Sequence, residues 1–545
     1  MSNEENPSNL PSNLPGASPS VAALPGKPAR GDALTTLLLL FMCVAFVLVN
    51  LATGTRNPRM WHDEIISCDP AANLVIGRGF TSSAMGPTGR HEFYGCTSPL
   101  YPLLLAGWFR ILGIGLLAAR SLNYVLMVGV VAGLIAASRR SGLITTRWPK
   151  VVLATALLCN FGISFNYRVA RCDVLGMLLC VMFYLEFTIA NSKFRRLALA
   201  LTAALLPAAG LQNVPFIAAV FLVVLLIGGW RLLPDMIIVG AGIIVGVAAI
   251  AGVLQYEHVL SRVFRFTFVL HGYGPKGGNP ATDPLRVVAE PGFPLKELVS
   301  VKGREFPSLV LLLGLAGAAL ITPIFRGDRS ARRLAIAAVL CAIVIPITMH
   351  VAGHFPAYYA WMMFLPTLVC FCACLDRLVK LPGSRAGLIL ASTAALLTCY
   401  GLPGHLTKAI LQWKQNDPQA IARFVKSVAR PSDVIYCNAS YYFAAKETTP
   451  DVMTLEYRDA MSPAERDSVS LILFNPADVD VVTKWLGGRW KETGEFFPAG
   501  LRDNSSYQPG LPTYVFCAYR RDPAPAPSDA DHTGLGNSSS LPAAQ

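Results

Sequence analysis

The sequence is poor in charged residues: Asp, Glu, Lys and Arg make up 14% of 545 residues, whereas hydrophobic residues make up 53%. An ordinary soluble globular protein has about 25% charged residues, so this composition excludes that class and indicates a polytopic membrane protein. The net charge of +13 comes from Lys and Arg that lie mainly in short links between apolar runs, where they set membrane orientation. The positive charge therefore does not indicate binding of nucleic acid.

Both ends of the chain also lack the apolar residues that a folded core needs. Residues 1–32 are rich in Pro, Ser, Asn and Gly and predict a disordered cytoplasmic tail, and residues 522–545 predict a second disordered tail. Residues 33–52 form an apolar run of about 20 residues, which is long enough to cross the hydrocarbon core of a membrane. Because a long polar tail precedes this run, we interpret it as a retained membrane span rather than a cleaved signal peptide.

Long apolar runs are abundant and predict about 11 transmembrane helices. The expected spans are 33–52, 119–138, 151–167, 169–190, 196–210, 211–229, 235–254, 306–325, 334–351, 355–375 and 384–401. Clusters of Lys and Arg follow four of these spans, and such clusters favour the cytoplasmic side of a membrane. All four clusters lie on that side only if a single span separates residues 53–97 from Arg139. We therefore interpret residues 99–108 as an interfacial helix, and place the loops 53–97 and 255–305 and the chain after residue 402 on the outer face.

The hydropathy falls after residue 412, which predicts a small extracytoplasmic α/β domain at 412–521, beyond the membrane part at 33–402. The expected helices and strands of this domain are 418–429 and 478–486, and 433–437, 471–474 and 514–519, respectively. The expected fold is therefore a polytopic α-helical membrane protein with one small outer α/β domain.

Most of the thirteen cysteines lie in the apolar runs, where a thiol is a small apolar filler. Four cysteines lie on the expected outer face: Cys68, Cys96, Cys437 and Cys517. Because an oxidising exterior permits disulfides, the sequence allows the pairs Cys68–Cys96 and Cys437–Cys517 without requiring either.

An acidic cluster follows the first span, on the expected outer face of the membrane. It contains His62, Asp63 and Glu64, and Asp69 follows about two helical turns after His62. A carboxylate at the bilayer surface can act as a general base or orient a nucleophile, so Asp63 and Glu64 are candidate catalytic residues. The alternative is a solvated loop that happens to be acidic.

A second polar cluster occupies the short outer turn between two expected spans and contains Arg168, Arg171 and Asp173. An Asp that enters a membrane helix is costly unless it is paired or hydrated, so this cluster is also a candidate functional site. The alternative is that the two arginines are interfacial anchors.

These two clusters, together with two further short motifs, resemble the GT-C class of membrane glycosyltransferases. The resemblance is to the branch of dolichyl-phosphate-mannose protein mannosyltransferases and bacterial aminoarabinose transferases. In that branch an Asp-Glu pair opens the first outer loop, a Pro-Leu-Tyr helix precedes an Ala-Arg-Leu span, and an Ala-Arg-x-Asp turn follows the third span. The corresponding residues here are Asp63-Glu64, Pro99–Tyr101, Ala119-Arg120 and Ala170–Asp173, and the likeness covers roughly residues 33–230.

The resemblance implies a glycosyltransferase of the bacterial plasma (inner) membrane that uses a polyprenyl-phosphate sugar donor. The acceptor would be a lipid, a glycan or a protein on the outer face. Arg120, Arg168 and Arg171 would hold the donor phosphate, because guanidinium groups bind phosphate oxygens well. Asp63 would be the general base in an attack that inverts the anomeric centre.

The resemblance further implies that Tyr101 and Asp173 contact the substrates, and His62, which precedes the acidic pair, is a further candidate substrate contact. The sequence departs from the family pattern at His62 and Ile65, which flank the acidic pair where aminoarabinose-type enzymes tend to have Arg or Tyr. The identities of the sugar and the acceptor therefore stay open.

Four residues near the expected ninth and tenth spans form another candidate substrate site: His350, His354, Tyr358 and Tyr359. His350 and His354 have the spacing of two metal ligands on one helix, but an intervening Gly and a following Pro argue against a continuous helix. The alternative is that these side chains bind the carrier phosphate or the sugar. The sequence requires no metal ion or other cofactor, although a divalent metal is compatible with it.

Lys276 lies in the outer loop within Gly272–Gly277, which formally matches the G-x-G-x-x-G motif. No strand precedes this motif, so it does not indicate a dinucleotide site. We interpret the segment either as a plain turn or as a flexible loop that closes over substrate, with Lys276 as a phosphate contact.

The main alternative from another class is a transporter or flippase for a lipid or a sugar, in which Asp63, Arg171 and Asp173 would form a coupling site. Such charges are expected near the bilayer midplane, whereas these cluster at one surface. A non-catalytic assembly or ligand-binding protein is a third interpretation. It would tolerate the loss of Asp63, which an enzyme would not.

Overall fold

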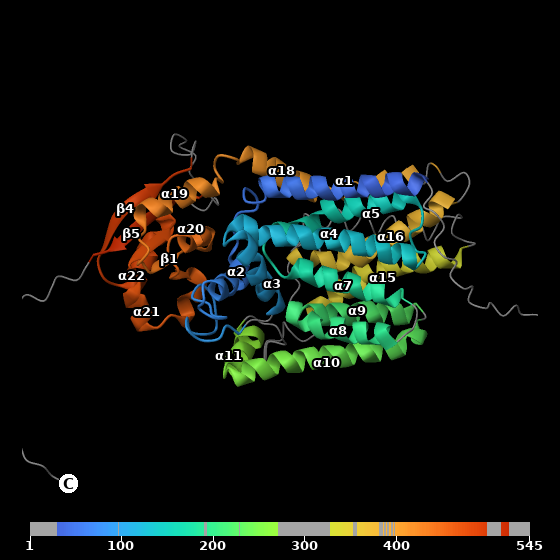
Figure 1. The fold of residues 1–545 in the computed structure, drawn as a ribbon, viewed down its shortest axis with the longest axis horizontal. Helices are drawn as coiled ribbons and strands as arrows, with labels where there is room; N and C mark the ends of the chain where they lie inside the picture. Colours follow the sequence, from blue (N-terminus) through green and yellow to red (C-terminus); the bar gives the residue numbers. More distant parts are fainter. Residues whose placement is uncertain are drawn as a thin grey trace, which may run out of the picture.

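The computed structural model describes residues 30–95, 98–189, 193–227, 229–270, 328–351, 357–380, a few positions between 385 and 396, 398–498 and 514–522. A bundle of long helices forms one part of the protein, and a smaller α/β domain lies at one end of the bundle (Figure 1). Helices α2 (His62–Val75) and α3 (Leu100–Leu112) lie between the bundle and this smaller domain, which is called the outer domain below because it lies at the end of the bundle.

The helices of the bundle are α1 (Arg30–Thr53), α4 (Leu116–Arg140), α5 (Arg147–Cys159), α6 (Phe161–Arg168), α7 (Asp173–Phe187), α8 (Lys193–Ala209), α9 (Asn213–Leu226), α10 (Leu233–Tyr256), α15 (Arg329–Val351), α16 (Ala360–Lys380) and α18 (Gly401–Leu411). Long helices such as α1, α4 and α10 run roughly along the long axis of the molecule in Figure 1. Shorter helical turns are Trp230–Leu232, α11 (Leu260–Phe264), Arg265–Leu270 and Ala357–Tyr359.

Five helices in the described ranges are long and apolar enough to cross a membrane, namely α1, α4, α10, α15 and α16, and the bent pair α5 and α6 would make a sixth. Helices also lie at the expected spans 169–190 and 211–229, but they are shorter, with 15 residues in α7 and 14 in α9. The expected span 306–325 lies outside the described residues, and 384–401 lies mostly outside them. The prediction of about 11 spans is therefore not confirmed.

The expected span 151–167 is a broken helix, because α5 and α6 meet at Asn160 with a bend of 56°. The Asn160 side-chain oxygen accepts a hydrogen bond from the backbone N–H of Gly162 at 2.9 Å. Asparagine at this position satisfies one of the donors that a new helix leaves free, so a second helix begins here. The last residue of that helix, Arg168, is fully buried.

Helices α8 and α10 pack closely through small residues. A Cβ atom added to Gly242 would lie 2.5 Å from the carbonyl oxygen of Ala200, and one added to Gly246 would collide with the carbonyl of Ala204. The two glycines are one turn apart, so together they form a smooth face against which a neighbouring helix backbone can lie.

Helix α3 has 13 residues, which is too short to cross a membrane. Its Tyr101 and Phe109 are buried, whereas Leu104 and Ile111 are exposed. A short helix with one buried and one apolar exposed face can lie at a membrane interface, and the interfacial position of residues 99–108 stays a prediction.

The outer domain is built around a small sheet. In the described part of the domain, five strands pair in the order β2-β1-β3-β5-β4. Strands β2, β1 and β3 are parallel, and β5 runs antiparallel to both β3 and β4. The strands are β1 (Ile435–Cys437), β2 (Val452–Thr454), β3 (Leu471–Phe474), β4 (Trp490–Phe496) and β5 (Phe516–Arg521). The helices are α19 (Pro418–Val428), α20 (Tyr442–Lys446), α21 (Pro463–Ser468) and α22 (Pro476–Leu486), with short turns at Ala439–Tyr441 and Leu455–Ala460.

Capping residues explain where two of these helices begin. Asp417 accepts a hydrogen bond from the backbone N–H of Gln419 at 3.1 Å, and Pro418 stands at the first position of α19, where its missing N–H costs nothing. Ser462 and Glu465 form a reciprocal capping box at the start of α21.

The helices expected at 418–429 and 478–486 correspond to α19 and α22, and the expected strands correspond to β1, β3 and β5. Strands β2 and β4 were not predicted. Strand β4 is an edge strand with exposed polar residues such as Lys491 and Glu492, so it lacks the apolar pattern that marks a strand in sequence.

The disulfide that the sequence allowed between Cys437 and Cys517 is absent, since both thiols are free. Strand β3 separates the two strands that carry them. Cys517 packs in the same apolar cluster as Tyr436, whereas Cys437 belongs to a different cluster. Because neighbouring residues of a strand face opposite sides of the sheet, the two sulfurs lie on opposite faces. Cys68 is likewise a free, buried thiol, and Cys96 lies outside the described residues.

Candidate functional site

The acidic cluster opens helix α2 at the end of the bundle that meets the outer domain (Figure 1). The Glu64 side chain accepts a hydrogen bond from the backbone N–H of Trp61 at 3.0 Å, which fixes the start of the helix. The three side chains at the start of this helix differ in exposure. Glu64 is fully buried, whereas the side chain of Asp63 is 15% exposed and that of His62 is 44% exposed.

Glu64 forms a buried, two-pronged ion pair with Arg120 of α4. Arg120 Nε donates to one carboxylate oxygen at 2.9 Å and Nη2 donates to the other at 2.6 Å. The backbone N–H of Ala170 also donates to Glu64 at 2.8 Å. Glu64 therefore ties α2 to α4 and to the turn before α7, and its oxygens are already occupied.

Arg120 and Arg168 both bind the backbone that connects α1 to α2. Arg120 donates to the carbonyl oxygens of Gly54, Pro58 and Arg59. Arg168 donates to the carbonyl oxygen of Asn57 at 2.6 and 2.9 Å, and its remaining donors reach Asn50 and Thr53. Both guanidinium groups are thus used in holding residues 50–59 in place.

Asp63 lies in a second cluster with residues from the turn before α7. Arg171 donates through Nη1 to Asp63 and through Nε to Asp173, the latter at 2.9 Å. Trp361 of α16 donates to the other oxygen of Asp173 at 3.3 Å. The structure therefore brings together Asp63, Arg171 and Asp173, which the sequence had singled out in separate segments.

Aromatic rings pack on the Arg171 guanidinium. Its central carbon lies 3.9 Å from the centre of the Tyr358 ring and 4.9 Å from the centre of the Trp61 ring. The Trp61 and Tyr358 rings also contact each other edge to face. Cation–π contacts of this kind fix the orientation of a guanidinium without using its hydrogen-bond donors. Tyr359 is buried beside Tyr358, with the two rings edge to face.

His62 and Asp63 form a hydrogen-bonded pair, with Nε2 of the imidazole 3.0 Å from a carboxylate oxygen. The hydrogen bond to Asp63 raises the pKa of His62 against the opposing effect of burial, and Glu456 of the outer domain adds to the rise while Arg171 reduces it. Burial alone would raise the pKa of Asp63. The hydrogen bond from His62 and the charge of Arg171 outweigh burial, so this pKa lies below its usual value.

Tyr101 of α3 is fully buried, and its hydroxyl has no hydrogen-bond partner within the described part of the chain. It lies within electrostatic range of Glu64 and Asp173. A buried hydroxyl without a partner is costly, which makes it a candidate contact for a bound substrate.

Several predicted site residues are not placed. Lys276 and His354 lie outside the described residues, and the side chain of His350, near the end of α15, is not described. The metal site considered for the two histidines is therefore untested. Among the residues that the structure does describe, no group of three His, Cys, Asp or Glu side chains could hold a metal ion.

Asp69, two turns after the acidic pair, joins α2 to the outer domain. One of its oxygens accepts hydrogen bonds from Tyr442 at 2.6 Å and from Lys446 at 3.0 Å. The other accepts from Ser82 at 2.8 Å and from the backbone N–H of Ser83 at 2.9 Å. This contact was not predicted from the sequence, because nothing in the residues around Lys446 marks it as buried. Trp361 was also missed, because an aromatic residue in an apolar span is ordinarily part of the packing.

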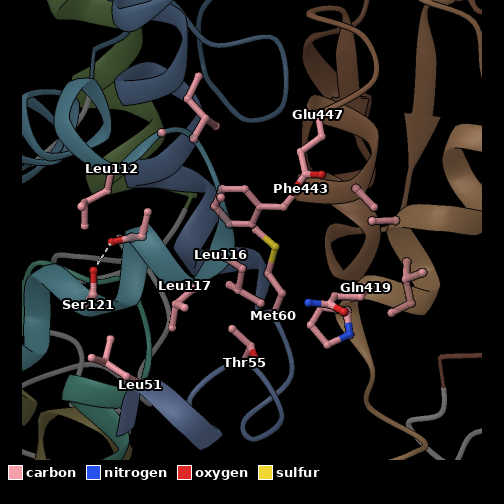
Figure 2. Close-up of a pocket in the computed structure, with 18 of the residues that line it drawn as sticks. Leu51, Thr55, Met60, Leu112, Leu116, Leu117, Ser121, Gln419, Phe443 and Glu447 are labelled. Atoms are coloured by element: carbon pink, nitrogen blue, oxygen red, sulfur yellow. Dashed lines mark hydrogen bonds between the residues drawn. The ribbon is translucent and has the colours of Figure 1, made fainter. Parts of the chain in front are cut away.

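A cavity of about 940 Å³ lies near this region, between the bundle and the outer domain. Figure 2 shows Leu51, Leu112, Leu116 and Leu117 on the bundle side, and Gln419, Phe443 and Glu447 on the side of the outer domain. None of the residues that line it belongs to the cluster of Asp63, Arg171 and Asp173. It is therefore separate from that cluster.

No protein-family model matches the chain, and no curated protein matches it significantly. Two crystal structures of ArnT from Cupriavidus metallidurans are similar to it. ArnT bound to undecaprenyl phosphate is 13% identical with a TM-score of 0.57, and ArnT in the apo state is 13% identical with a TM-score of 0.52. In both comparisons the likeness covers 89% of this chain and 98% of ArnT. At this level of identity the likeness concerns the fold alone, and the fold of this chain is similar to that of ArnT.

Proposed function

We propose that this protein is an integral-membrane glycosyltransferase that moves a sugar from a polyprenyl-phosphate donor to an acceptor on the outer face of the membrane. The observation that carries the proposal is the cluster of Asp63, Arg171 and Asp173, which lies where the bundle meets the outer domain of a GT-C fold. The undecaprenyl phosphate bound to ArnT supports a carrier of the same class for this chain.

Arg171 is the residue that we assign to the donor phosphate. Its Nε and Nη1 atoms bind the two carboxylates, and no hydrogen bond among the described residues uses its Nη2 atom. Release of the sugar leaves negative charge on the phosphate, which a fixed guanidinium can stabilise. Arg120 and Arg168, which the sequence also suggested as phosphate ligands, are assigned instead to holding residues 50–59, because their donors are already used.

Asp63 is the proposed general base, because its carboxylate is partly exposed whereas that of Glu64 is buried. The proton of the acceptor hydroxyl or amine moves to the Asp63 carboxylate, and the acceptor atom forms a bond to the anomeric carbon. The bond between that carbon and the phosphate oxygen breaks, and its electron pair stays on the phosphate. Attack from the face opposite the phosphate inverts the anomeric centre.

We infer the orientation of the protein in the membrane from the position of its basic residues. Arg139 and Arg140 end α4 at the far end of the bundle from the outer domain (Figure 1). Because basic residues favour the cytoplasmic side, we place the N-terminus in the cytoplasm and the outer domain outside it, in the plasma membrane of a bacterium. A reporter fused after residue 402 tests this orientation, and its appearance in the cytoplasm would overturn it.

The decisive experiment measures the release of free polyprenyl phosphate by the purified protein in lipid, with a panel of radiolabelled polyprenyl-phosphate sugars. We expect wild type to release the carrier and Asp63→Asn to lose this activity. Asp480→Asn, at an exposed position on α22, is the matched control and should keep it. If folded wild-type protein releases no carrier from any donor, a transporter or flippase becomes the better interpretation. The position of the charges at one end of the bundle argues against that interpretation.

A further inference from the structure

The cavity between the bundle and the outer domain has two chemically different walls (Figure 2). One wall consists of apolar residues at the end of α1, the end of α3 and the start of α4. They include Leu51, Leu112, Leu117 and Val125, whose side chains are 37%, 53%, 41% and 49% exposed. Exposed apolar residues on helices long enough to cross a membrane, such as Leu51 of α1 and Leu117 of α4, are expected to face lipid, so this wall continues the apolar surface of the bundle.

The opposite wall belongs to the outer domain and carries charged residues among apolar ones such as Ile421 and Phe443. It carries Arg423 and Lys426 on α19, and Glu447 just after α20. Lys426 forms an exposed ion pair with Glu447 at 3.3 Å, so two positive charges and one negative charge stand on this wall. The wall therefore has a positive excess at the level where lipid headgroups meet the protein.

The cavity is distinct from the proposed donor site. Met60 lines the cavity, whereas the next residue, Trp61, packs on Arg171 and Tyr358. The buried pair of Glu64 and Arg120 ties the same stretch of chain to α4. The segment that leads into α2 therefore has the cavity on one side and the Asp63 cluster on the other.

We propose that this cavity binds an anionic phospholipid from the leaflet beside the outer domain, with an acyl chain against the leucines of α1, α3 and α4. The headgroup phosphate lies near Arg423 and Lys426. A volume of about 940 Å³ lies within the range of ligand-binding pockets, and the apolar wall and the positive charges match the acyl chain and the headgroup of such a lipid. The site goes beyond the proposed transferase activity, because it lies apart from the residues assigned to that reaction.

The test uses the full chain in nanodiscs of phosphatidylcholine with increasing phosphatidylglycerol and a photoactivatable phosphatidylglycerol probe. Crosslinked peptides are then mapped by mass spectrometry. We expect saturable crosslinking to residues 112–125 and 418–447, and stronger protection by phosphatidylglycerol than by phosphatidylcholine. Uniform crosslinking along the lipid-facing helices, without saturation, would show that the cavity holds no specific lipid.

Two pairs of variants and controls test separately how the charge and the shape of the cavity affect lipid binding. Arg423→Gln with Lys426→Gln should weaken saturable crosslinking roughly tenfold or more, since each basic group near a membrane surface contributes appreciably to binding of an anionic lipid. Lys484→Gln with Lys491→Gln removes two exposed charges outside the cavity and should change nothing. Leu117→Trp should fill the cavity and abolish the saturable signal, whereas Leu40→Trp, on an exposed part of α1 outside the cavity, should not. Equal behaviour of each variant and its control would overturn the proposal.

Polyprenyl phosphate combines the same two chemical features, so a competition experiment distinguishes it from a phospholipid. We expect added polyprenyl phosphate to leave the phosphatidylglycerol crosslinks in the cavity unchanged. Displacement at equimolar amounts would overturn the assignment to a phospholipid and give the cavity to the carrier. This outcome is independent of carrier release by the Asp63 site, so the two proposals can fail separately.

Discussion

Lys446 and Asp69 form a fully buried ion pair that joins the outer domain to the helix carrying the acidic cluster, with Nζ and Oδ1 3.0 Å apart. Lys446 also donates to Asn73 at 2.7 Å and to the carbonyl oxygen of Pro450 at 3.0 Å, so all three of its donors have partners. Asp451 adds a second link from the outer domain, through Arg78 and Arg90. The outer domain thus holds α2, and with it Asp63, against the end of the bundle.

Replacing Lys446 by Met should destabilise the protein by about 3–5 kcal/mol, because Asp69 would remain as a buried charge without its main partner. Thermal unfolding in detergent and release of the outer domain by limited proteolysis measure the effect. Lys426→Met is the matched control, since its ion pair with Glu447 is exposed and worth about 0–1 kcal/mol. Equal melting temperatures for the two variants would contradict the prediction.

The sequence predicted the central strands and the longer helices of the outer domain because these elements carry apolar residues at regular spacing. It missed β4, where Gly494 and the polar residues around it are recognisable as a strand only from their pairing with β5. The three residues of β2 are too few to show a pattern.

The sequence also identified the charged residues of the site, but it could not predict their partners. Asp63 and Arg171 are 108 positions apart, and although both were candidate site residues, the ion pair between them was not predicted. Whether Arg120 binds a phosphate or the buried Glu64 depends on how α4 packs against α2. The spacing of residues along the sequence carries no information about this packing. Lys446 carried no signal at all, because a lysine in a short helix is ordinarily exposed.

The pair of His62 and Asp63 should make stability depend on pH. The pKa of His62 is raised in the folded state, so the contribution of this pair is fully present below the unfolded pKa, about 6.5, and is lost as pH rises through the higher folded value. Melting temperatures of wild type and His62→Gln should therefore differ most at mildly acidic pH and converge at alkaline pH. His91→Gln, at an exposed position, is the control. A difference that grows with rising pH would contradict the prediction.

Cys437 and Cys517 should behave as free, unreactive thiols. Burial raises the pKa of Cys517 to about 12 and also raises that of Cys437, so little of either thiol is present as the reactive thiolate at neutral pH. We expect maleimide to label both only after denaturation, and electrophoretic mobility to be the same with and without reductant. A crosslinked peptide that contains both cysteines, isolated from unreduced protein, would contradict the structure.

Arg120→Lys should impair the protein even though it keeps the positive charge. Arg120 reaches both oxygens of Glu64 and three backbone carbonyls from one planar group, whereas a lysine has three donors on a single atom and cannot reproduce this geometry. The loss should appear as lower thermal stability, of about 2–4 kcal/mol as for other disrupted buried pairs, together with a lower rate of carrier release. Arg110→Lys, near the exposed end of α3, is the control and should behave as wild type. If Arg120 instead contacts the donor phosphate, Arg120→Lys should raise KM for the donor while leaving the melting temperature unchanged, so the two roles give opposite results in the same pair of measurements.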